Sequence, residues 1–418
     1  MKAAFTIVAQ NYIGLAKILE QSFLEKNKDA DFVIFVSDEY DGVETDVIEA
    51  RTVLNISQET WQDMCFKYDI TEFCTAIKPF CFSYLFSDRG YDIALYFDPD
   101  IYVFSSLDDV FDKLTEKTFY LTPHIVTPDS KPNDDRVFLQ SGIYNLGFIG
   151  ISSSSEAKLF LAWWESRLMN LCFDDLFSYT FTDQKWANFI PAFFPEKVFV
   201  STHLGMNFAP WNYFERQVIF KDDKFYVKNR IMNSSDEYPL LFVHYSGFNY
   251  KELIEGKVSR NRRGAVEIYE DVTNVLDFYK EVIIKSINIF SKYIDLPYSY
   301  GVYKNGDKID RIHRRIYRNM TENNIWVESP FCTGKGSFYS KIASRGMITN
   351  SNVNRLSQES VSQLDSKSRF FCRIMKMVYR VLGYKRYLQL LKFLKYFSRY
   401  EAQAFLIEPS MTSHVLPK

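Results

Sequence analysis

The chain has 418 residues, of which 47% are hydrophobic and 24% are charged, with a formal net charge of −2. This composition excludes a disordered chain, a collagen-like repeat and a small disulfide-rich protein. The charge is unevenly divided. Residues 1–250 carry 21 Lys and Arg against 36 Asp and Glu, a net −15, whereas residues 251–418 carry 29 against 16, a net +13. Such a division favours an anionic partner for the basic part.

The sequence carries no sign of secretion. The apolar run at residues 3–9 is too short for a signal peptide, and no window approaches the roughly 18 uninterrupted apolar residues of a membrane-spanning helix. The six cysteines form no Cys-x-x-Cys pair. Scattered cysteines are typical of a reducing compartment. We therefore expect a cytoplasmic protein. Peripheral binding to the inner face of a membrane is a further interpretation.

Short apolar runs alternate with helical spacing through the first half of the chain. The runs that predict strands are residues 3–9, 32–36, 93–97 and 143–151. The segments that predict helices are residues 13–24, 73–86 and 156–170, and residues 106–109 predict the start of another helix. Buried strands alternating with helices predict an α/β sheet covered on both faces.

The pattern changes after the first 255 residues, and we predict four parts. They are an α/β catalytic domain at 1–255, a helical extension and candidate acceptor region at 256–335, a polar linker at 336–368, and a basic amphipathic helical tail at 369–418. The basic cluster at 311–318 is a candidate site for an anionic acceptor or for the acidic first half of a partner chain. The second half is thus predicted to be mainly helical.

The acidic tripeptide at residues 98–100, Asp-Pro-Asp, follows the predicted strand 93–97. Ligands of α/β proteins bind at the carboxyl ends of parallel strands. Paired carboxylates at such an edge can hold Mg²⁺ or Mn²⁺ against a phosphate group. The same spacing at residues 29–31 lies in a segment rich in Lys, Asn and Asp, which is typical of a solvated turn. The context therefore predicts a metal site at Asp98 and Asp100, and none at Asp29 and Asp31.

Seven motifs follow one another in order through residues 3–251. They are FTIVAQNY (5–12), KPF (78–80), LYFDPDIYV (95–103), YNLGF (144–148), TDQKWAN (182–188), NFAPWN (207–212) and VHYSGFNYK (243–251). The ordered set resembles GT-A-fold glycosyltransferases, closest to the family 8 type and related bacterial polysaccharide and lipopolysaccharide enzymes. One departure is that Lys251 stands one residue later than the family's lysine, with no Pro-Trp after it.

The resemblance implies a Rossmann-like mixed sheet and a metal-dependent, retaining enzyme with a nucleotide-sugar donor, expected to be a UDP-sugar. It implies Mn²⁺ or Mg²⁺ held by Asp98, Asp100 and His244. The donor-binding residues that it implies are Ala9, Asn11, Tyr12, Lys78, Asp98, Gly247 and Lys251. The residues that it implies around the reacting sugar are Asn145, Asp183 and Gln184.

Several of these residues also have a purely structural interpretation. His244 fits a buried, hydrogen-bonded histidine, and Lys78 fits a solvated helix lysine. Asp183 fits a helix N-cap. Trp211 fits either core packing or stacking on a sugar face. His124, close to an acidic segment at 127–136, is interpreted as structural.

The tail is predicted to be helical over residues 369–399, with a break or bend near Gly383. Its charged residues are all basic. Ten Lys and Arg lie between residues 367 and 399, and no acid lies between Asp365 and Glu401. Arg369, Arg373, Lys376 and Arg380 line one helix face, and apolar residues fill the others. Two interpretations stay open, docking on an anionic membrane surface and packing on the tail's own domain. No nucleic-acid-binding motif is present, so nucleic acid is not expected.

The sequence thus predicts a hexosyltransferase that acts on a glycan or glycolipid acceptor in bacterial surface polysaccharide synthesis. The alternative is a non-catalytic scaffold with the same fold that binds glycan or membrane. A sugar nucleotidyltransferase is disfavoured because the turn after the first strand, Gln10–Gly14, lacks a glycine-rich basic loop.

Overall fold

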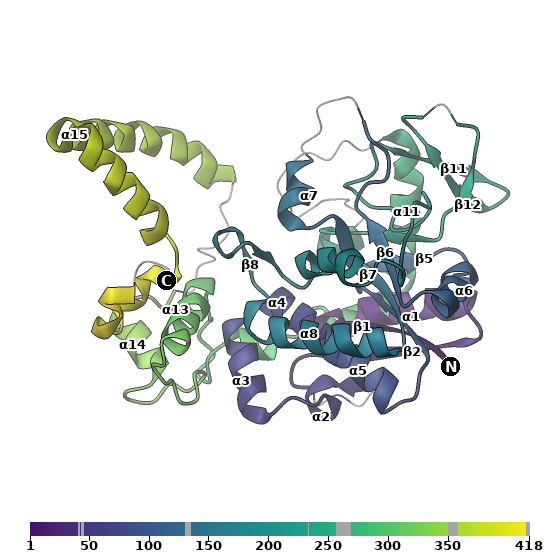
Figure 1. Ribbon diagram of the computed structural model, residues 1–418, viewed down its shortest axis with the longest axis horizontal. Coiled ribbons are helices and arrows are strands. Elements are labelled where there is room, and N and C mark those ends of the chain that lie inside the picture. The colour runs from purple at the N-terminus through teal and green to yellow at the C-terminus, as the bar shows by residue number, and fades with distance from the viewer. Residues whose placement is uncertain are drawn as a thin grey trace. The chain divides into compact units, whose positions relative to one another are not determined.

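The chain forms two compact units in the computed structural model (Figure 1). The structure describes residues 1–40, 42, 46–129, 135–232, 234–255, 269–349 and 358–414. The first unit comprises Met1–Trp61 and Ile70–Tyr298, and the second comprises Gln62–Asp69 and Ser299–Lys418. Residues 256–268, where the helical extension was expected to begin, lie outside the described residues.

A seven-stranded mixed sheet forms the centre of the first unit, with the order β10-β6-β7-β4-β1-β2-β3. Its strands are β1 (Lys2–Val8), β2 (Ala30–Val36), β3 (Val47–Glu49), β4 (Ile93–Phe97), β6 (Phe119–Pro123), β7 (Tyr144–Ser152) and β10 (Val198–Val200). β1 runs parallel to β2 and β4, whereas β7 runs antiparallel to β4 and β6. The reversal places the start of β7 beside the end of β4.

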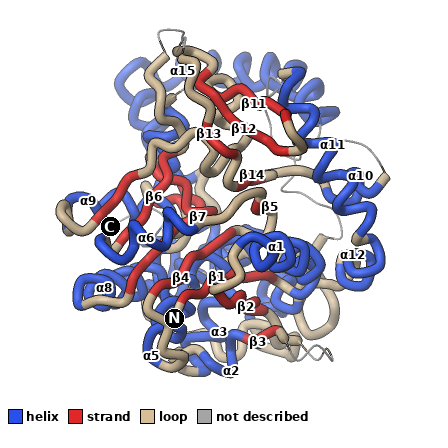
Figure 2. Tube along the Cα trace, turned by 90° about the vertical axis from the view of Figure 1, so that its right-hand side faces the viewer, coloured by secondary structure: helices blue, strands red, loops and turns tan. Residues whose placement is uncertain are grey.

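Helices cover both faces of this sheet because successive strand side chains point to opposite sides. Phe97 packs in one cluster with Phe23 of α1 (Ile13–Lys26) and Phe111 of α6 (Asp108–Glu116). On the other face, Phe5 meets Phe82 with 4.7 Å between ring centroids. The helices on that face are α4 (Ile70–Ala76), α5 (Lys78–Ser87) and α8 (Ser155–Leu171). Figure 2 shows α1 and α5 on opposite sides of β1, β2 and β4.

Smaller elements surround the main sheet. The short strands are β5 (Ile101–Val103), β8 (Asp174–Asp175), β9 (Thr180–Phe181), β11 (Arg216–Lys221), β12 (Lys224–Asn229), β13 (Tyr238–Pro239) and β14 (Phe242–His244). The remaining α-helices of the unit are α2 (Ala50–Val53), α7 (Arg136–Ser141), α9 (Ile190–Phe193), α10 (Tyr250–Ile254), α11 (Glu270–Lys285) and α12 (Ile287–Tyr293). Its 3₁₀ turns are η1 (Gln10–Tyr12), η2 (Leu176–Ser178) and η3 (Gln184–Phe189). α3 (Gln58–Lys67) crosses from the first unit into the second.

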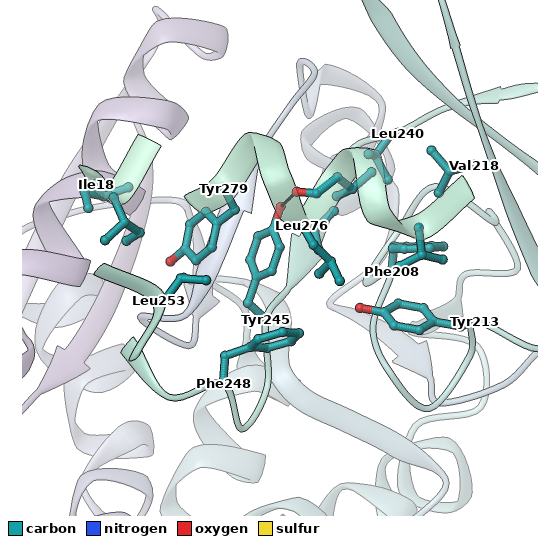
Figure 3. Packing of buried hydrophobic residues seen from close by; sticks show 14 of the residues in the cluster. Ile18, Phe208, Tyr213, Val218, Leu240, Tyr245, Phe248, Leu253, Leu276 and Tyr279 are labelled. Carbon is teal, nitrogen blue, oxygen red and sulfur yellow. Dashed lines mark hydrogen bonds between the residues drawn. The ribbon is translucent and has the colours of Figure 1, made fainter. Parts of the chain in front are cut away.

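α11 belongs to the first unit, although the sequence places it in the extension after residue 255. Its apolar face packs on the segment that follows β14 (Figure 3). The rings of Tyr245 and Tyr279 stack with 3.8 Å between centroids, and the Tyr245 hydroxyl donates to the Val275 carbonyl at 3.1 Å. This packing fixes the chain immediately after His244.

The second unit has its own core, built on α13 (Arg311–Glu322). Its other elements are α14 (Phe338–Ser344), the long helix α15 (Gln358–Phe397), and the 3₁₀ turns η4 (Ser299–Gly301), η5 (Glu401–Leu406) and η6 (Pro409–His414). Phe66, Tyr317 and Phe338 pack in the core. α14 occupies part of the segment expected to be a polar linker, because Phe338 and Ile342 are buried there. Residues 350–357 of that segment lie outside the described residues.

Three arginines of the basic cluster at 311–318 are buried in the interior of this unit. Arg314 is 3% exposed, and its guanidinium donates to the carbonyls of Cys65, Phe66, Tyr68 and Tyr300. Its charge therefore stabilises the carboxyl end of α3, where a helix carries partial negative charge. Arg315 and Arg318 are also buried. These three arginines do not form a surface for an anionic acceptor.

α15 breaks at Gly383, where the sequence predicts a bend. Gly383 has a φ of +67°, a conformation that a residue with a side chain rarely adopts. No residue from 368 to 400 is buried within the described chain. Among the described residues, no helix is both long and apolar enough to cross a membrane.

The predicted fold class, a mixed sheet flanked by helices with a mainly helical C-terminal part, is confirmed. One predicted helix, residues 73–86, is two helices, because α4 ends at Ala76 and α5 begins at Lys78. Pro79 stands in the first turn of α5, where its missing N–H and fixed φ are tolerated. The break presents Lys78 at the start of a helix facing the sheet.

Candidate active site

Two carboxylates and an imidazole converge where β4 ends. The chain turns through Asp98 and Asp100 into β5, and β14 pairs antiparallel with β5 so that His244 stands opposite Ile101. His244 Nε2 lies 3.1 Å from Asp100 Oδ1 and 3.6 Å from Asp98 Oδ2. One ligand atom from each residue lies within 4.8 Å of the other two. The sheet topology thus assembles the three residues that the motifs single out as metal ligands.

The tautomer of His244 follows from its neighbours. The Gly147 N–H donates to Asn145 Oδ1 at 3.2 Å, which identifies that atom as the oxygen. His244 Nδ1 lies 3.3 Å from the same oxygen, so Nδ1 carries the proton. In the neutral ring, the lone pair on Nε2 then faces two carboxylates.

A cation at Nε2 removes the repulsion between that lone pair and the carboxylate oxygens. A proton serves this purpose in the absence of metal, and a divalent ion does so by coordination. Metal-bound histidines commonly donate their second N–H to an oxygen, as His244 does here. Two carboxylates with one imidazole form an oxygen-rich set suited to Mn²⁺ or Mg²⁺. The residues therefore fit the implied metal.

Gly147 leaves space for the imidazole. A Cβ at this position would lie 2.4 Å from His244 Cε1 and 2.7 Å from Nδ1. Both distances are far below van der Waals contact, so any side chain here displaces the ring. The glycine of the Asn-Leu-Gly motif is thus required by His244, which comes from a strand about 100 residues later in the chain.

An amide network continues from Asn145 away from the carboxylates. Asn145 Nδ2 donates to Gln184 Oε1 at 3.1 Å, and Gln184 Nε2 donates to the Ser141 carbonyl at 3.0 Å. Asn207, fully buried and with a φ of +51°, donates to Asn145 Oδ1 at 3.0 Å. Among the described residues, Asn207 Oδ1 has no hydrogen-bond partner. The network fixes the amides of Asn145 and Gln184 in one orientation.

Lys78 and Asp183 form a buried ion pair beside this network. Their side chains are 1% and 3% exposed, and Lys78 Nζ lies 2.5 Å from Asp183 Oδ2. The same ammonium donates to the Leu146 carbonyl at 2.8 Å and lies 3.8 Å from the centre of the Tyr96 ring. Burial raises the pKa of Asp183, and the Lys78 charge opposes that rise. The interpretation of Lys78 as a solvated helix lysine is wrong. Asp183 stands at the N-cap of η3, but its side chain makes no capping bond.

The candidate donor-binding residues after β1 occupy one turn. Ala9 is buried and accepts from the Tyr12 N–H at 2.8 Å. Asn11 Oδ1 is buried without a hydrogen-bond partner in the described chain. Tyr12 is 36% exposed, and the pKa of its hydroxyl is raised by partial burial and then by the charge of Asp100. This turn therefore lies close to the metal group.

Gly247 and Lys251 follow β14. Gly247 has a φ of +81°, which lets the backbone turn after His244. Lys251 lies on α10 with its side chain 62% exposed, in an ion pair with Asp295. The structure thus brings together Asp98, Asp100, His244, Asn145 and Gln184 by direct contacts. The Lys78–Asp183 pair is linked to them through Tyr96 and Leu146. The ion pair described for Lys251 is with Asp295 and with none of these residues.

Sequence reasoning missed Tyr96, which connects the two halves of the site. Its hydroxyl donates to Asp98 Oδ1 at 2.7 Å, and its ring lies under Lys78. Burial raises the pKa of Tyr96 well above its ordinary value, so the hydroxyl keeps its proton. A signal was present, because residues two apart on a strand share a face and Tyr96 precedes Asp98 by two.

His124 and Trp211 enclose the imidazole side of the site. The Trp211 ring is perpendicular to His244 with 5.1 Å between centroids, and it also makes an edge contact with His124. His124 Nδ1 lies 3.0 Å from the Ile143 carbonyl. These contacts restrict the movement of His244.

Comparison with known proteins gives one curated relative. No family model matches the chain. The uncharacterized protein YfnD of Bacillus subtilis (strain 168) is 30% identical over 182 residues, which is 42% of this chain and 54% of that protein. The chain thus spans about half the length of the curated relative that it matches.

Among the solved structures similar to the chain are three glycosyltransferases. The galactosyltransferase LgtC, in complex with donor and acceptor sugar analogues, is 14% identical, with 71% of this chain and 97% of LgtC covered and a TM-score of 0.35. GlyE of Streptococcus pneumoniae TIGR4 is 15% identical, with 72% and 66% covered and a TM-score of 0.37. Mouse xyloside xylosyltransferase 1 is 12% identical, with 59% and 97% covered and a TM-score of 0.36.

Proposed function

We propose that the chain is a metal-dependent hexosyltransferase. It transfers a sugar from a nucleotide-sugar, expected to be a UDP-hexose, to a glycan or glycolipid acceptor in bacterial surface polysaccharide synthesis. The observation that carries the proposal is the convergence of Asp98, Asp100 and the Nε2 lone pair of His244 on one point. Two carboxylates and one imidazole nitrogen gathered at one point form a ligand set suited to Mn²⁺ or Mg²⁺, which supports a metal site.

In this function, Asp98, Asp100 and His244 hold Mn²⁺ or Mg²⁺. The metal supplies Lewis-acid stabilisation of the leaving diphosphate. Ala9, Asn11 and Tyr12 contact the uridine, and the orphan Asn11 Oδ1 is available to accept from a base N–H. Gly247 allows the backbone to approach the phosphates. Lys251 would contact the diphosphate by exchanging Asp295 for a phosphate oxygen.

The reacting sugar lies, in our proposal, against Asn145, Asp183 and Gln184. The amide network holds Asn145 and Gln184 ready for sugar hydroxyls, so little ordering is needed on binding. Lys78 favours the ionised form of the buried Asp183. An anionic Asp183 would stabilise positive charge at the anomeric carbon, and we expect the configuration there to be retained.

A panel of nucleotide-sugars with Mn²⁺, scored by nucleotide release, tests the proposal. We expect one donor to be turned over, and Asp98→Asn or Asp100→Asn to lower the rate by roughly 100-fold or more, because metal stabilisation contributes several kcal/mol. Asp29→Asn is the matched control, since Asp29 has the same spacing to a second acid but is exposed in a turn. Equal rates in all three variants would contradict the proposal.

Docking on an anionic membrane surface through residues 369–399 is part of this proposal. The absence of buried residues from 368 to 400 supports it over packing of the tail on its own unit. Phe370, Phe371 and Tyr384 are each more than half exposed. Exposed aromatic residues among basic ones suit the headgroup region of a bilayer. Such docking would bring the enzyme to a lipid-linked acceptor.

A further inference from the structure

The carboxylate of Asp98 accepts a hydrogen bond from Tyr96, a residue to which the sequence motifs assign no role. Tyr96 is 1% exposed, and its hydroxyl donates to Asp98 Oδ1 at 2.7 Å. The other oxygen, Oδ2, is the one that faces His244 Nε2, at 3.6 Å. Asp98 Oδ1 is therefore engaged by Tyr96, whereas Oδ2 faces the candidate metal position.

The Tyr96 hydroxyl has one defined position. Phe5 packs against the ring with 5.3 Å between centroids, and the Lys78 ammonium lies 3.8 Å from its centre. Tyr96 and Asp98 share a face because they are two residues apart at the end of β4. The Asp98 N–H also donates to the Gly147 carbonyl at 2.7 Å, so both the backbone and one carboxylate oxygen of Asp98 are fixed.

We propose that Tyr96 is a positioning residue that presents Asp98 Oδ2 to the metal. Its role matches that of Asn145 on the opposite side, which fixes the Nδ1 proton and thereby presents His244 Nε2. The inference rests on the proposed metal-dependent function and extends it. Side chains that orient metal ligands typically contribute 10- to 100-fold to metal affinity.

The contact with Lys78 gives Tyr96 a second consequence. Lys78 bonds Asp183 and lies over the Tyr96 ring, while Tyr96 bonds Asp98. Lys78 and Tyr96 thus connect Asp183, proposed to face the sugar, with Asp98, proposed to bind the metal. Tyr96 therefore sets the position of the metal relative to Asp183.

The Tyr96→Phe variant isolates the hydroxyl. Phenylalanine keeps the ring contacts with Phe5 and Lys78 and removes only the O–H. The Asp98 side chain is 30% exposed, so water can replace the lost donor and folding is not endangered. Tyr120→Phe is the matched control. Tyr120 is buried in the same sheet, on β6, and its hydroxyl contacts the Met206 sulfur at 3.3 Å.

The measurement is Mn²⁺ binding to the full chain without donor, followed by the electron paramagnetic resonance signal of free Mn²⁺. We expect the dissociation constant to rise by roughly 10- to 100-fold in Tyr96→Phe and to stay unchanged in Tyr120→Phe. Thermal unfolding in EDTA should leave the two variants alike. Added Mn²⁺ should raise the melting temperature less in Tyr96→Phe than in the unaltered protein.

The possible results separate this inference from the proposed function. If the unaltered protein binds Mn²⁺, Asp98→Asn does not, and Tyr96→Phe binds as tightly as the unaltered protein, the role of Tyr96 is overturned and the metal site stands. An equal loss of affinity in Tyr120→Phe would also overturn it, because a general packing effect would then explain the change. No Mn²⁺ binding by the unaltered protein would overturn the metal-dependent function itself.

Discussion

At the scale of single residues, the site depends on two opposite charges that are buried against each other. Lys78 and Asp183 are both almost completely removed from water. Breaking a buried pair leaves the remaining charge without compensation, which costs about 3–5 kcal/mol. The pair therefore constrains both residues far more than an exposed ion pair would.

Replacing Lys78 by methionine should make the stability of the protein depend on pH in a predictable direction. Burial raises the pKa of Asp183 already, and without Lys78 it rises further. A carboxyl whose pKa is higher in the folded than in the unfolded state stabilises the fold at low pH, and this contribution is lost as the pH rises. Near neutral pH we expect Lys78→Met to lower the free energy of unfolding by roughly 3–5 kcal/mol. This loss should become smaller towards pH 5.

Urea denaturation of the variant and the unaltered protein at several pH values measures this deficit. The double variant Lys78→Met/Asp183→Asn serves as the control, because it carries no charge at either position. We expect it to recover part of the stability and to show no such pH dependence. A deficit that is the same at every pH would mean that Asp183 is not the group left unpaired.

At the scale of elements, β7 shows how one strand serves both the core and the site. Gly147 faces His244, and Gly150 faces Leu95 and Leu114 on the other side. A Cβ at Gly150 would lie 2.7 Å from Leu114 Cδ1, which is the end of a side chain. The two glycines are therefore required for different reasons, the first for the imidazole and the second for helix packing on the sheet.

The variants Gly147→Ala and Gly150→Ala should distinguish the metal site from core packing. In Gly147→Ala, the displaced His244 should weaken Mn²⁺ binding by about 10-fold or more. In Gly150→Ala, overpacking should lower the free energy of unfolding by about 1–3 kcal/mol and leave Mn²⁺ affinity unchanged. Metal titration and urea denaturation of both variants provide the comparison. Unchanged Mn²⁺ affinity in Gly147→Ala would show that His244 is not a ligand.

At the scale of the whole molecule, the charge division separates the two proposed contacts. The first 250 residues carry a net −15 and contribute one buried lysine, Lys78, to the site, whereas the remainder carries +13. Part of that positive charge lies inside the second unit, as Arg314 does. The exposed remainder on α15 is the part that can meet an anionic surface.

Vesicle co-sedimentation of the full chain tests this contact. Each basic residue near an anionic surface contributes about 1 kcal/mol, so Arg373→Glu/Lys376→Glu/Arg380→Glu should nearly abolish binding to phosphatidylserine-containing vesicles. The control reverses three exposed lysines of the first unit, Lys28, Lys158 and Lys224, and should bind almost normally. Equal binding by both triple variants would remove α15 from the proposed contact.

Local patterns in the sequence were sufficient for much of the fold. The strand Ile93–Phe97 was predicted with its observed bounds because a short apolar run before Asp-Pro-Asp is a strong local signal. The break of α15 at Gly383 followed from glycine alone. Asp98 and Asp100 were identified as candidate metal ligands from their place after a strand, and His244 through the ordered resemblance. The structure places the three together.

Other features were decided only by tertiary structure, because they depend on residues distant in the sequence. Lys78 reads as a surface lysine until the sheet places Asp183 beside it, 105 residues later. Arg314 belongs to a basic cluster in the sequence, but its guanidinium is used by carbonyls near residue 66. α11 joins the first unit because of Tyr245. The charge balance of −2 was fixed by the sequence, but burial decided which of those charges face a ligand and which hold the interior together.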